Sequence, residues 1–174
     1  MSELSQIYVV DTSVLFSTWM NRMKDGNFVT VTGVIEEIKN RPSRLRTEIL
    51  LHLDKLKEEA PESLSLDIVR TTAKDSGDLK VLSETDIDLI SLAHTKMTNG
   101  FSTTLVSSDL AVLNTARHVG ISTLDPSGKF QHEIIWLLKC PACNRKSKST
   151  VKTLDCPVCG TQMRRIVSSK KKIR

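Results

Sequence analysis

All four cysteines of the chain stand in two short segments of the form Cys-x-x-Cys, Cys140–Cys143 and Cys156–Cys159. Each segment is followed by a residue that tolerates a positive φ angle, Asn144 in the first case and Gly160 in the second. In that conformation the backbone curls so that its N–H groups point at the sulfur atoms. Two matched turns of this kind predict a closed tetrahedral zinc site, in which the metal holds shape and performs no reaction.

The same cysteine spacing could also hold two disulfides or a redox-active dithiol. Zinc is favoured because the sequence shows no secretory segment and no spare cysteine. For the same reason we expect a cytoplasmic, reducing location. No membrane partner is expected, since no apolar run approaches the roughly 20 residues that a membrane span needs. A structural metal in a small module means that catalytic residues must be sought upstream.

Four acids upstream of the cysteines fall at the ends of predicted elements: Asp11, Glu37, Asp86 and Asp109. Asp11 ends an apolar strand predicted at residues 7–10, and Asp109 follows a strand predicted at 104–106. Because sites in open parallel sheets form beyond the carboxyl ends of strands, these two acids can meet if their strands are neighbours. Clustered carboxylates repel each other unless a cation binds, and oxygen ligands suit Mg²⁺ or Mn²⁺. Such an ion activates water for phosphodiester hydrolysis.

Each of these acids also has a purely structural interpretation. Asp11 and Asp109 could cap the helices that follow them, and Asp86 could be half of a capping box. Glu37 could be a solvated helix residue, and Glu36 beside it is an alternative ligand. The coincidence of acids at four element ends favours a shared site over four separate caps.

The elements that would position these acids alternate between strands and helices, which predicts an α/β fold with a mostly parallel sheet. Strands are expected at 7–10, 64–69, 104–106 and 121–124, and helices from Val14, at 34–38, from Ser43 to Pro61, from Ser83 to Thr98 and at 109–118. The helix after Ser43 would place leucines and an isoleucine on one face, which predicts a core position for them: Leu45, Ile49, Leu53 and Leu56.

The sequence divides by composition into four parts: residues 1–124, a turn-rich linker at 125–133, a zinc module at 134–168 and a basic tail at 169–174. Residues 139–174 contain 11 lysines and arginines and one acid. Residues 1–138 contain 14 lysines and arginines and 19 acids. A basic module beside an acidic domain is typical of a nucleic-acid grip. The predicted RNA contacts are Lys139, Arg145, Lys146, Lys148, Arg164 and Arg165, while Lys170–Lys172 could be a solvated tail.

Four segments resemble, in order, the acidic motifs of PIN-domain nucleases: residues 9–13, 34–38, 82–86 and 105–109. The segment from Trp136 to Arg165 resembles the zinc ribbon of the archaeal NOB-type endonucleases, relatives of the Nin-one-binding protein of ribosome assembly. The resemblance implies a PIN-like α/β/α sandwich followed by a small β-rich zinc ribbon. It also implies a catalytic Mg²⁺ or Mn²⁺ bound by the four acids, with polar supports at Thr12, Ser13, Ser107 and Asn114.

By this resemblance the protein is a metal-dependent endoribonuclease that cuts precursor small-subunit ribosomal RNA near the 3′ end of the mature molecule. The products would be a 5′-phosphate and a 3′-hydroxyl, and the partner the assembling small ribosomal subunit. One departure is Ser108, where many relatives carry another acid. Asp88 ranks second as a ligand, because on a helix it points about 200° away from Asp86.

Other functions stay open on the sequence. The missing acid at Ser108 would suit a non-catalytic adaptor with a degenerate nuclease fold that binds RNA or the ribosome. A toxin-like PIN nuclease acting on mRNA or tRNA is disfavoured by the ribbon. A phosphotransfer enzyme of the haloacid-dehalogenase type would need an acid where Ser13 stands. A dinucleotide-binding fold would need a glycine-rich loop after the first strand.

Overall fold

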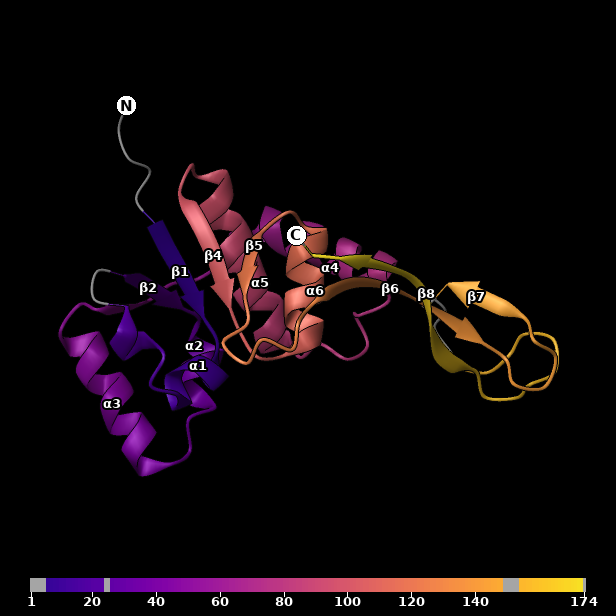
Figure 1. Cartoon of the computed structure of the whole chain (residues 1–174), viewed down its shortest axis with the longest axis horizontal. Coiled ribbons are helices and arrows are strands. Elements are labelled where there is room, and N and C mark those ends of the chain that lie inside the picture. Colours follow the sequence, from indigo (N-terminus) through magenta and orange to yellow (C-terminus); the bar gives the residue numbers. More distant parts are fainter. Residues whose placement is uncertain (1–5, 24–25, 149–153, 174) are drawn as a thin grey trace.

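The computed structural model describes residues 6–23, 26–148 and 154–173 of the 174-residue chain. Two sheets organise these residues (Figure 1). A five-stranded parallel sheet with helices packed around it forms a larger body, and a three-stranded antiparallel sheet projects from it as an arm. The prediction of an α/β sandwich followed by a small β-rich module is therefore confirmed. Among the described residues, no helix combines the length and the apolar character needed to span a bilayer.

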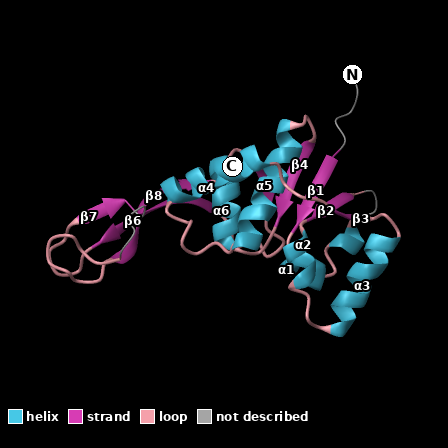
Figure 2. Ribbon diagram, turned by 180° about the vertical axis from the view of Figure 1, so that it is seen from behind, coloured by secondary structure: helices cyan, strands magenta, loops and turns pink. Residues whose placement is uncertain are grey.

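The parallel sheet is built from β1 (Gln6–Val10), β2 (Asn27–Thr30), β3 (Leu56–Glu58), β4 (Ser102–Val106) and β5 (Ser122–Leu124). The helices of the body are α1 (Thr12–Phe16), α2 (Thr32–Glu36), α3 (Arg41–His52), α4 (Ser63–Ser76), α5 (Glu84–Thr98) and α6 (Leu110–His118), with a 3-10 turn at Met20–Arg22. The arm consists of β6 (His132–Lys139), β7 (Lys146–Lys148) and β8 (Arg164–Lys172). Figure 2 shows the helices flanking the strands of the body.

The order of the parallel strands, β3-β2-β1-β4-β5, puts β1 and β4 side by side in the middle. From β1 the chain continues outward to β2, and from β4 it continues outward to β5 in the opposite direction. Open parallel sheets bind ligands at such a switch point, beyond the carboxyl ends of the strands. Val10 at the end of β1 pairs with Val106 at the end of β4. The predicted neighbourhood of these strands is confirmed, so the acids that follow them come to one edge.

The core of the body lies between the sheet and its helices. Val9 and Val10 of β1 and Leu105 and Val106 of β4 are fully buried, as expected of central parallel strands that are covered on both faces. Helix α5 begins at the predicted capping box and is buried over most of its circumference, from Ile87 to Thr95 except Asp88. The central strands and α5 therefore form a rigid base for the acids at the strand ends.

One predicted strand is wrong, because residues 64–69 belong to helix α4. Apolar and polar residues alternate there, which imitates a strand. The buried positions are instead spaced as on a helix: Ser65, Val69 and Ala73 are buried four residues apart, while Leu64 is 68% exposed. Strand-like alternation was a coincidence on a helix that buries small side chains.

The helix predicted from Ser43 to Pro61 is also too long. Helix α3 begins after Asn40, whose Oδ1 accepts the Ser43 N–H group at 2.9 Å, and it ends at His52. Beyond it, Leu56 is buried in β3. Strands β2 and β3 were not predicted, because runs of four and three residues are too short to show a pattern.

The apolar stripe of α3 does not face the core, contrary to the prediction. Leu45, Ile49 and Leu53 are 57%, 50% and 57% exposed. The buried positions of this helix are the small polar residues Ser43 and Thr47, and the Thr47 hydroxyl donates to the Ser43 carbonyl at 3.0 Å. Leu50 and Leu51 of the same helix, which the prediction did not include, are partly buried and pack against the core instead.

The arm is held together by the pairing of β6 with β8, from His132 opposite Lys172 to Lys139 opposite Arg164. Strand β7 pairs with the other edge of β6. Both long strands extend beyond the residues 134–168 that were expected to form the zinc module, and β8 brings the C-terminus back beside the body (Figure 1). How the chain divides into folding units stays a prediction.

Candidate functional site

Asp11 lies between the two central strands, immediately after β1. Its backbone N–H donates to the carbonyl of Val106 at 3.1 Å, which extends the pairing of β1 with β4 by one residue. One carboxylate oxygen accepts the Thr12 N–H at 2.6 Å, so Asp11 does cap α1. The other oxygen accepts the hydroxyls of Ser13 at 3.1 Å and Ser107 at 2.6 Å. These contacts fix the orientation of the carboxylate without using all of its lone pairs.

Two serine hydroxyls connect the end of β1 to the end of β4. Ser107 is fully buried, and its Oγ both donates to Asp11 and accepts the Asp109 N–H at 2.9 Å. The Ser13 hydroxyl accepts the Ser108 N–H at 3.2 Å. These hydrogen bonds therefore couple the position of Asp11, after β1, to that of Asp109, after β4. Their support of a metal site stays a prediction.

Asp109 and Asp86 also act as caps, as the alternative interpretation predicted. One oxygen of Asp109 accepts the N–H groups of Ala111 at 2.7 Å and Val112 at 3.3 Å, at the start of α6. One oxygen of Asp86 accepts the N–H and the hydroxyl of Ser83, each at 2.8 Å. The hydrogen bonds between described residues use a single oxygen of each carboxylate. Capping and metal binding are thus compatible in both acids.

Glu37 reaches the same edge through Thr12, whose hydroxyl donates to the Glu37 carboxylate at 2.8 Å. This contact distinguishes Glu37 from Glu36, which the sequence left as an alternative. Asp88 was the second choice as a metal ligand on helical geometry. Its carboxyl group interacts electrostatically with Glu84 and Arg70. Burial raises the pKa of Asp88, and Glu84 raises it further while Arg70 lowers it.

Asp11, Glu37, Asp86 and Asp109 form an edge that is called here the four-acid edge. Burial raises the pKa of Asp11 above its ordinary value and the charge of Asp86 adds to this, while hydrogen bonds from Ser107, Thr12 and Ser13 oppose it. Within the described residues, none of the four acids forms an ion pair with a lysine, arginine or histidine. A divalent cation would relieve this repulsion.

The donor set at the four-acid edge fits a hard cation, because it consists of oxygen atoms alone. The carboxylates are not closed around a common point: in the described part of the chain, the four cysteines are the one group of potential ligands whose atoms all lie within 4.8 Å. An open arrangement is compatible with Mg²⁺, which keeps several water molecules and commonly uses one or two carboxylates.

The four cysteines converge at the far end of the arm. The sulfur atoms of Cys140 and Cys159 are 3.4 Å apart, and those of Cys143 and Cys156 are 3.5 Å apart. A disulfide bond would require about 2 Å, whereas sulfurs around a tetrahedral zinc ion are about 3.8 Å apart. The group therefore fits zinc rather than two disulfides.

The turns around the cysteines have the predicted backbone conformation. Asn144 has a φ angle of 59° and Gly160 one of 70°. The Cys143 N–H points at the sulfur of Cys140, 3.4 Å away. Hydrogen bonding with Thr161 lowers the pKa of Cys159 to about 6. A backbone hydrogen bond with Arg145 lowers the pKa of Cys143, but the neighbouring sulfurs outweigh it and raise that pKa to about 12. A bound metal would require the thiolate form of all four cysteines.

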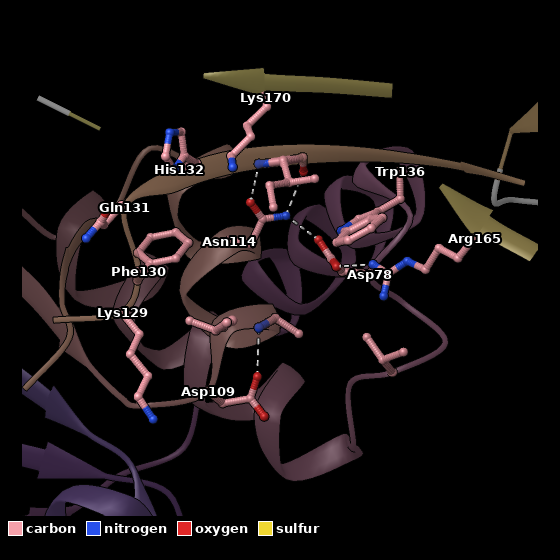
Figure 3. A pocket seen from close by; sticks show the side chains of 14 residues that line it. Asp78, Asp109, Asn114, Lys129, Phe130, Gln131, His132, Trp136, Arg165 and Lys170 are labelled. Carbon is pink, nitrogen blue, oxygen red and sulfur yellow. Dashed lines mark hydrogen bonds and ion pairs between the residues drawn. The ribbon is translucent and has the colours of Figure 1, made fainter. Parts of the chain in front are cut away.

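A buried ion pair that the sequence did not reveal joins the arm to the body. Asp78, in the segment before α5, is 1% exposed and pairs with Arg165 of β8. The Arg165 guanidinium also stacks on Trp136 of β6, 4.2 Å from the ring centroid (Figure 3). Arg165 was predicted to contact RNA, but its charge is committed to Asp78. The partners are 87 residues apart, and a single sequence offers no signal for such a pairing.

Asn114 takes part in this junction instead of facing the four acids. Its amide nitrogen donates to Asp78 at 2.6 Å and to the Ile134 carbonyl at 2.8 Å, and its amide oxygen accepts the Ile134 N–H at 2.7 Å. It thereby binds helix α6 to strand β6 as a neighbouring strand would. The predicted support by Asn114 is indirect at most, through α6, which begins at Asp109.

Comparison with known families identifies the larger body. The model of the family described as the PIN domain of ribonuclease matches residues 8–95, about half of the chain. The chain belongs to the PIN-domain ribonuclease family. The matched region of this PIN-domain ribonuclease contains Asp11, Glu37 and Asp86, and it ends before Asp109 and the cysteines.

Relatives of this PIN-domain ribonuclease align with most of the chain. Ribonuclease VapC1 of Thermoplasma acidophilum is 31% identical over 97% of this chain and 82% of its own length. Endoribonuclease Nob1 of Archaeoglobus fulgidus is 30% identical over 95% of each chain. Endoribonuclease Nob1 of Pyrococcus abyssi is 31% identical over 79% of this chain and 82% of its own length. The alignments with the first two relatives extend over nearly the whole chain, so they include most of both the body and the arm.

Proposed function

We propose that this protein is a metal-dependent endoribonuclease that hydrolyses a phosphodiester bond in precursor small-subunit ribosomal RNA. The observation that carries the proposal is the four-acid edge, where acids from four elements lie near the switch point and, among the described residues, form no ion pair with a basic side chain. The relatives named Endoribonuclease Nob1 support the endonucleolytic activity. The assembling small ribosomal subunit in the cytoplasm is the proposed setting of the reaction.

The residues of the four-acid edge would bind Mg²⁺ or Mn²⁺ through the carboxylate oxygens that capping leaves available. When bound, the ion would supply an activated water and stabilise charge on the phosphoryl group. Ser13 and Ser107 hold the Asp11 carboxylate in one orientation, and Thr12 holds Glu37 beside it. Hydrolysis by water without a covalent intermediate would leave a 5′-phosphate and a 3′-hydroxyl.

The arm would bind Zn²⁺ through its four cysteines and RNA through its basic residues. Four of the predicted contact residues are exposed: Arg145, Lys146, Lys148 and Arg164. A fifth, Lys139, is partly buried. Attraction of RNA by the arm is needed because the four-acid edge repels phosphate. Counterion release by these side chains supplies affinity that does not depend on sequence.

A single-turnover cleavage assay tests the proposed function. The substrate is an RNA that spans the 3′ end of the mature small-subunit molecule, with Mn²⁺ present and the products mapped at nucleotide resolution. Asp11→Asn should slow cleavage by at least about 100-fold, since a metal contributes several kcal/mol to such reactions, and should leave RNA binding nearly unchanged. Asp75→Asn, at an exposed acid of α4, is the matched control. Equal cleavage by the Asp11 variant and the wild type would refute the proposal.

A non-catalytic RNA-binding adaptor is the second candidate function. Two observations favour it: Ser108 stands where many relatives carry an acid, and no three acids among the described residues converge within 4.8 Å. An adaptor would bind the same RNA and leave it intact at every Mn²⁺ concentration. The assay above therefore separates the two candidates.

A further inference from the structure

A cavity of about 500 Å³ opens beside Asp109, where the arm joins the body (Figure 3). Its walls come from the start of α6, the segment before α5, the loop before β6, and strands β6 and β8. Its floor includes Asn114 and the ion pair of Asp78 with Arg165. The volume lies within the range of small-molecule sites in proteins. Because Asp109 belongs to both the cavity and the four-acid edge, a ligand in the cavity would lie next to the candidate metal site.

One side of the cavity is apolar although it is open to solvent. The Phe130 ring points into the space (Figure 3). Val81 and Leu110, which also line it, are 54% and 50% exposed. Two large aliphatic side chains and an aromatic ring around one open cavity are suited to a flat ligand with an apolar face.

Basic side chains also line the cavity, on either side of Phe130 in Figure 3. Lys129 from the loop, His132 from β6 and Lys170 from β8 line it. Within the described residues, none of the three forms an ion pair. The positive charge of the two lysines beside an apolar wall suits a ligand that combines a flat ring with a phosphate.

The loop that presents Lys129 and Phe130 is held in place before any ligand binds. One carboxylate oxygen of Asp125 accepts the N–H groups of Lys129 at 2.7 Å and Phe130 at 2.9 Å. The Ser127 N–H donates to the other oxygen at 2.8 Å. Ordering these side chains in advance lowers the entropic cost of binding.

We propose that this cavity binds one nucleotide of single-stranded RNA that flanks the scissile phosphodiester bond. The base stacks on Phe130 between Val81 and Leu110, and Lys129 and Lys170 contact the adjoining phosphates. Stacking on an aromatic ring tolerates every base, so the cavity positions the strand rather than reading its sequence. The location next to the scissile bond rests on the proposed function, whereas the binding of a base does not.

An abasic scan of the RNA tests the proposal. The full-length Asp11→Asn variant is used so that the RNA stays intact during the measurement. Its affinity is measured for a series of RNAs that each lack one base. The variant should bind about tenfold more weakly to the RNA that lacks the base at one particular position, the effect typical of a lost base–aromatic stack. In the Asp11→Asn, Phe130→Leu double variant this penalty should disappear, because the ring that the base contacts is gone. The penalty is a ratio within one protein, so a partial loss of folded protein does not imitate the result.

Matched controls on the same chain sharpen the scan. Phe101 is 38% exposed just before β4, at the end of the strand away from the four-acid edge, so Phe101→Leu should leave the penalty unchanged. A neutral methylphosphonate placed beside the sensitive register should weaken binding to the parent protein, and Lys170→Gln should abolish that effect. Lys171→Gln should leave the effect of the methylphosphonate unchanged, because successive residues of a strand point to opposite faces.

Three results would overturn the proposal. If the loss of affinity is the same at every position of the RNA, or if the protein binds no RNA detectably, no base occupies a defined cavity. An unchanged penalty after Phe130→Leu places the base elsewhere. Binding of free adenosine monophosphate as tight as that of RNA, without a sensitive register, assigns the cavity to a free nucleotide. A sensitive register that depends on Phe130, in a protein whose wild type cleaves no RNA, would instead refute the proposed function and keep the cavity assignment.

Discussion

The body and the arm reach stability by different means. The body buries a large apolar cluster that runs through its central strands and helices. The buried cluster of the arm consists of Leu138, Cys140, Cys156 and Met163, and two of these are candidate metal ligands. A module of this size rarely folds on its apolar core alone. The same chain therefore encodes one fold by hydrophobic pattern and the other by the spacing of cysteines.

The two regions also differ in charge, and they meet at a specific junction. Acids outnumber bases in residues 1–138, and the reverse holds in residues 139–174. The ion pair of Asp78 with Arg165 and the double hydrogen bond of Asn114 with Ile134 hold the regions together. A basic arm that is fixed to the body can present RNA to an acidic edge that would otherwise repel it.

Removal of zinc should produce the largest difference between the two regions. Structural zinc contributes about 10–16 kcal/mol to folding in small modules, so a zinc chelator should unfold the arm and leave the body folded. The chain has two tryptophans, Trp19 in the body and Trp136 in β6. In NMR spectra the indole signal of Trp136 should shift while that of Trp19, which packs on Tyr8 and Phe28, stays in place. Simultaneous loss of both signals would show that the body depends on the arm.

Breaking the junction should have the next largest effect, and an asymmetric one. Arg165→Met leaves the buried Asp78 carboxylate without its cationic partner, although Asn114 and Ser76 still donate to it, and should lower the free energy of unfolding by about 3 kcal/mol. Asp78→Asn should cost less, about 1 kcal/mol, because Arg165 is 28% exposed and can turn to water. Urea denaturation of the two variants and of the double variant measures both. Equal losses would mean that the carboxylate is not the critical buried charge.

Neutralising the arm should weaken the salt dependence of RNA binding. Replacement of Arg145, Lys146 and Arg164 by glutamine removes three exposed charges, and the slope of log K against log salt should flatten by about 2 for single-stranded RNA. The matched triple variant in the body replaces Lys55, Lys57 and Lys74, all exposed, and should change the slope little. Equal slopes for the two triple variants would contradict the division of labour between arm and body.

The smallest expected effect concerns the stability of the four-acid edge. The pKa of Asp11 is raised above the model-compound value of 3.8, mainly by burial. The folded state therefore binds protons more tightly than the unfolded chain, and the free energy of unfolding falls as the pH rises above 3.8. Without divalent cations, Asp11→Asn should be slightly more stable than the wild type at neutral pH, and this gain should vanish below pH 3.8. Thermal unfolding from pH 3 to 8 measures it, with Asp75→Asn, at an exposed acid of α4, as the comparison variant.

Some features of the fold followed from short-range patterns and were predictable. The apolar run before Asp11, the capping box at Ser83 and the turns after each cysteine pair were predicted from a few neighbouring residues, and each has the expected local structure. The failures are equally local in origin. Residues 64–69 alternate like a strand, and their membership of α4 is decided by which small side chains pack on the neighbouring helices. On α3, Leu50 and Leu51 pack against the core while Leu45 and Ile49 face outward.

The sequence by itself determined the cysteine site and the placement of acids at element ends, because both depend on residue types at short spacing. The tertiary structure alone decided that β1 and β4 are neighbours, which brings Asp11 to Ser107 and Asp109. It also decided that Arg165 serves Asp78 and that a cavity forms beside Asp109. The physical reason is distance along the chain: contacts between remote residues arise from the packing of whole elements, and the elements themselves carry no local record of their partners.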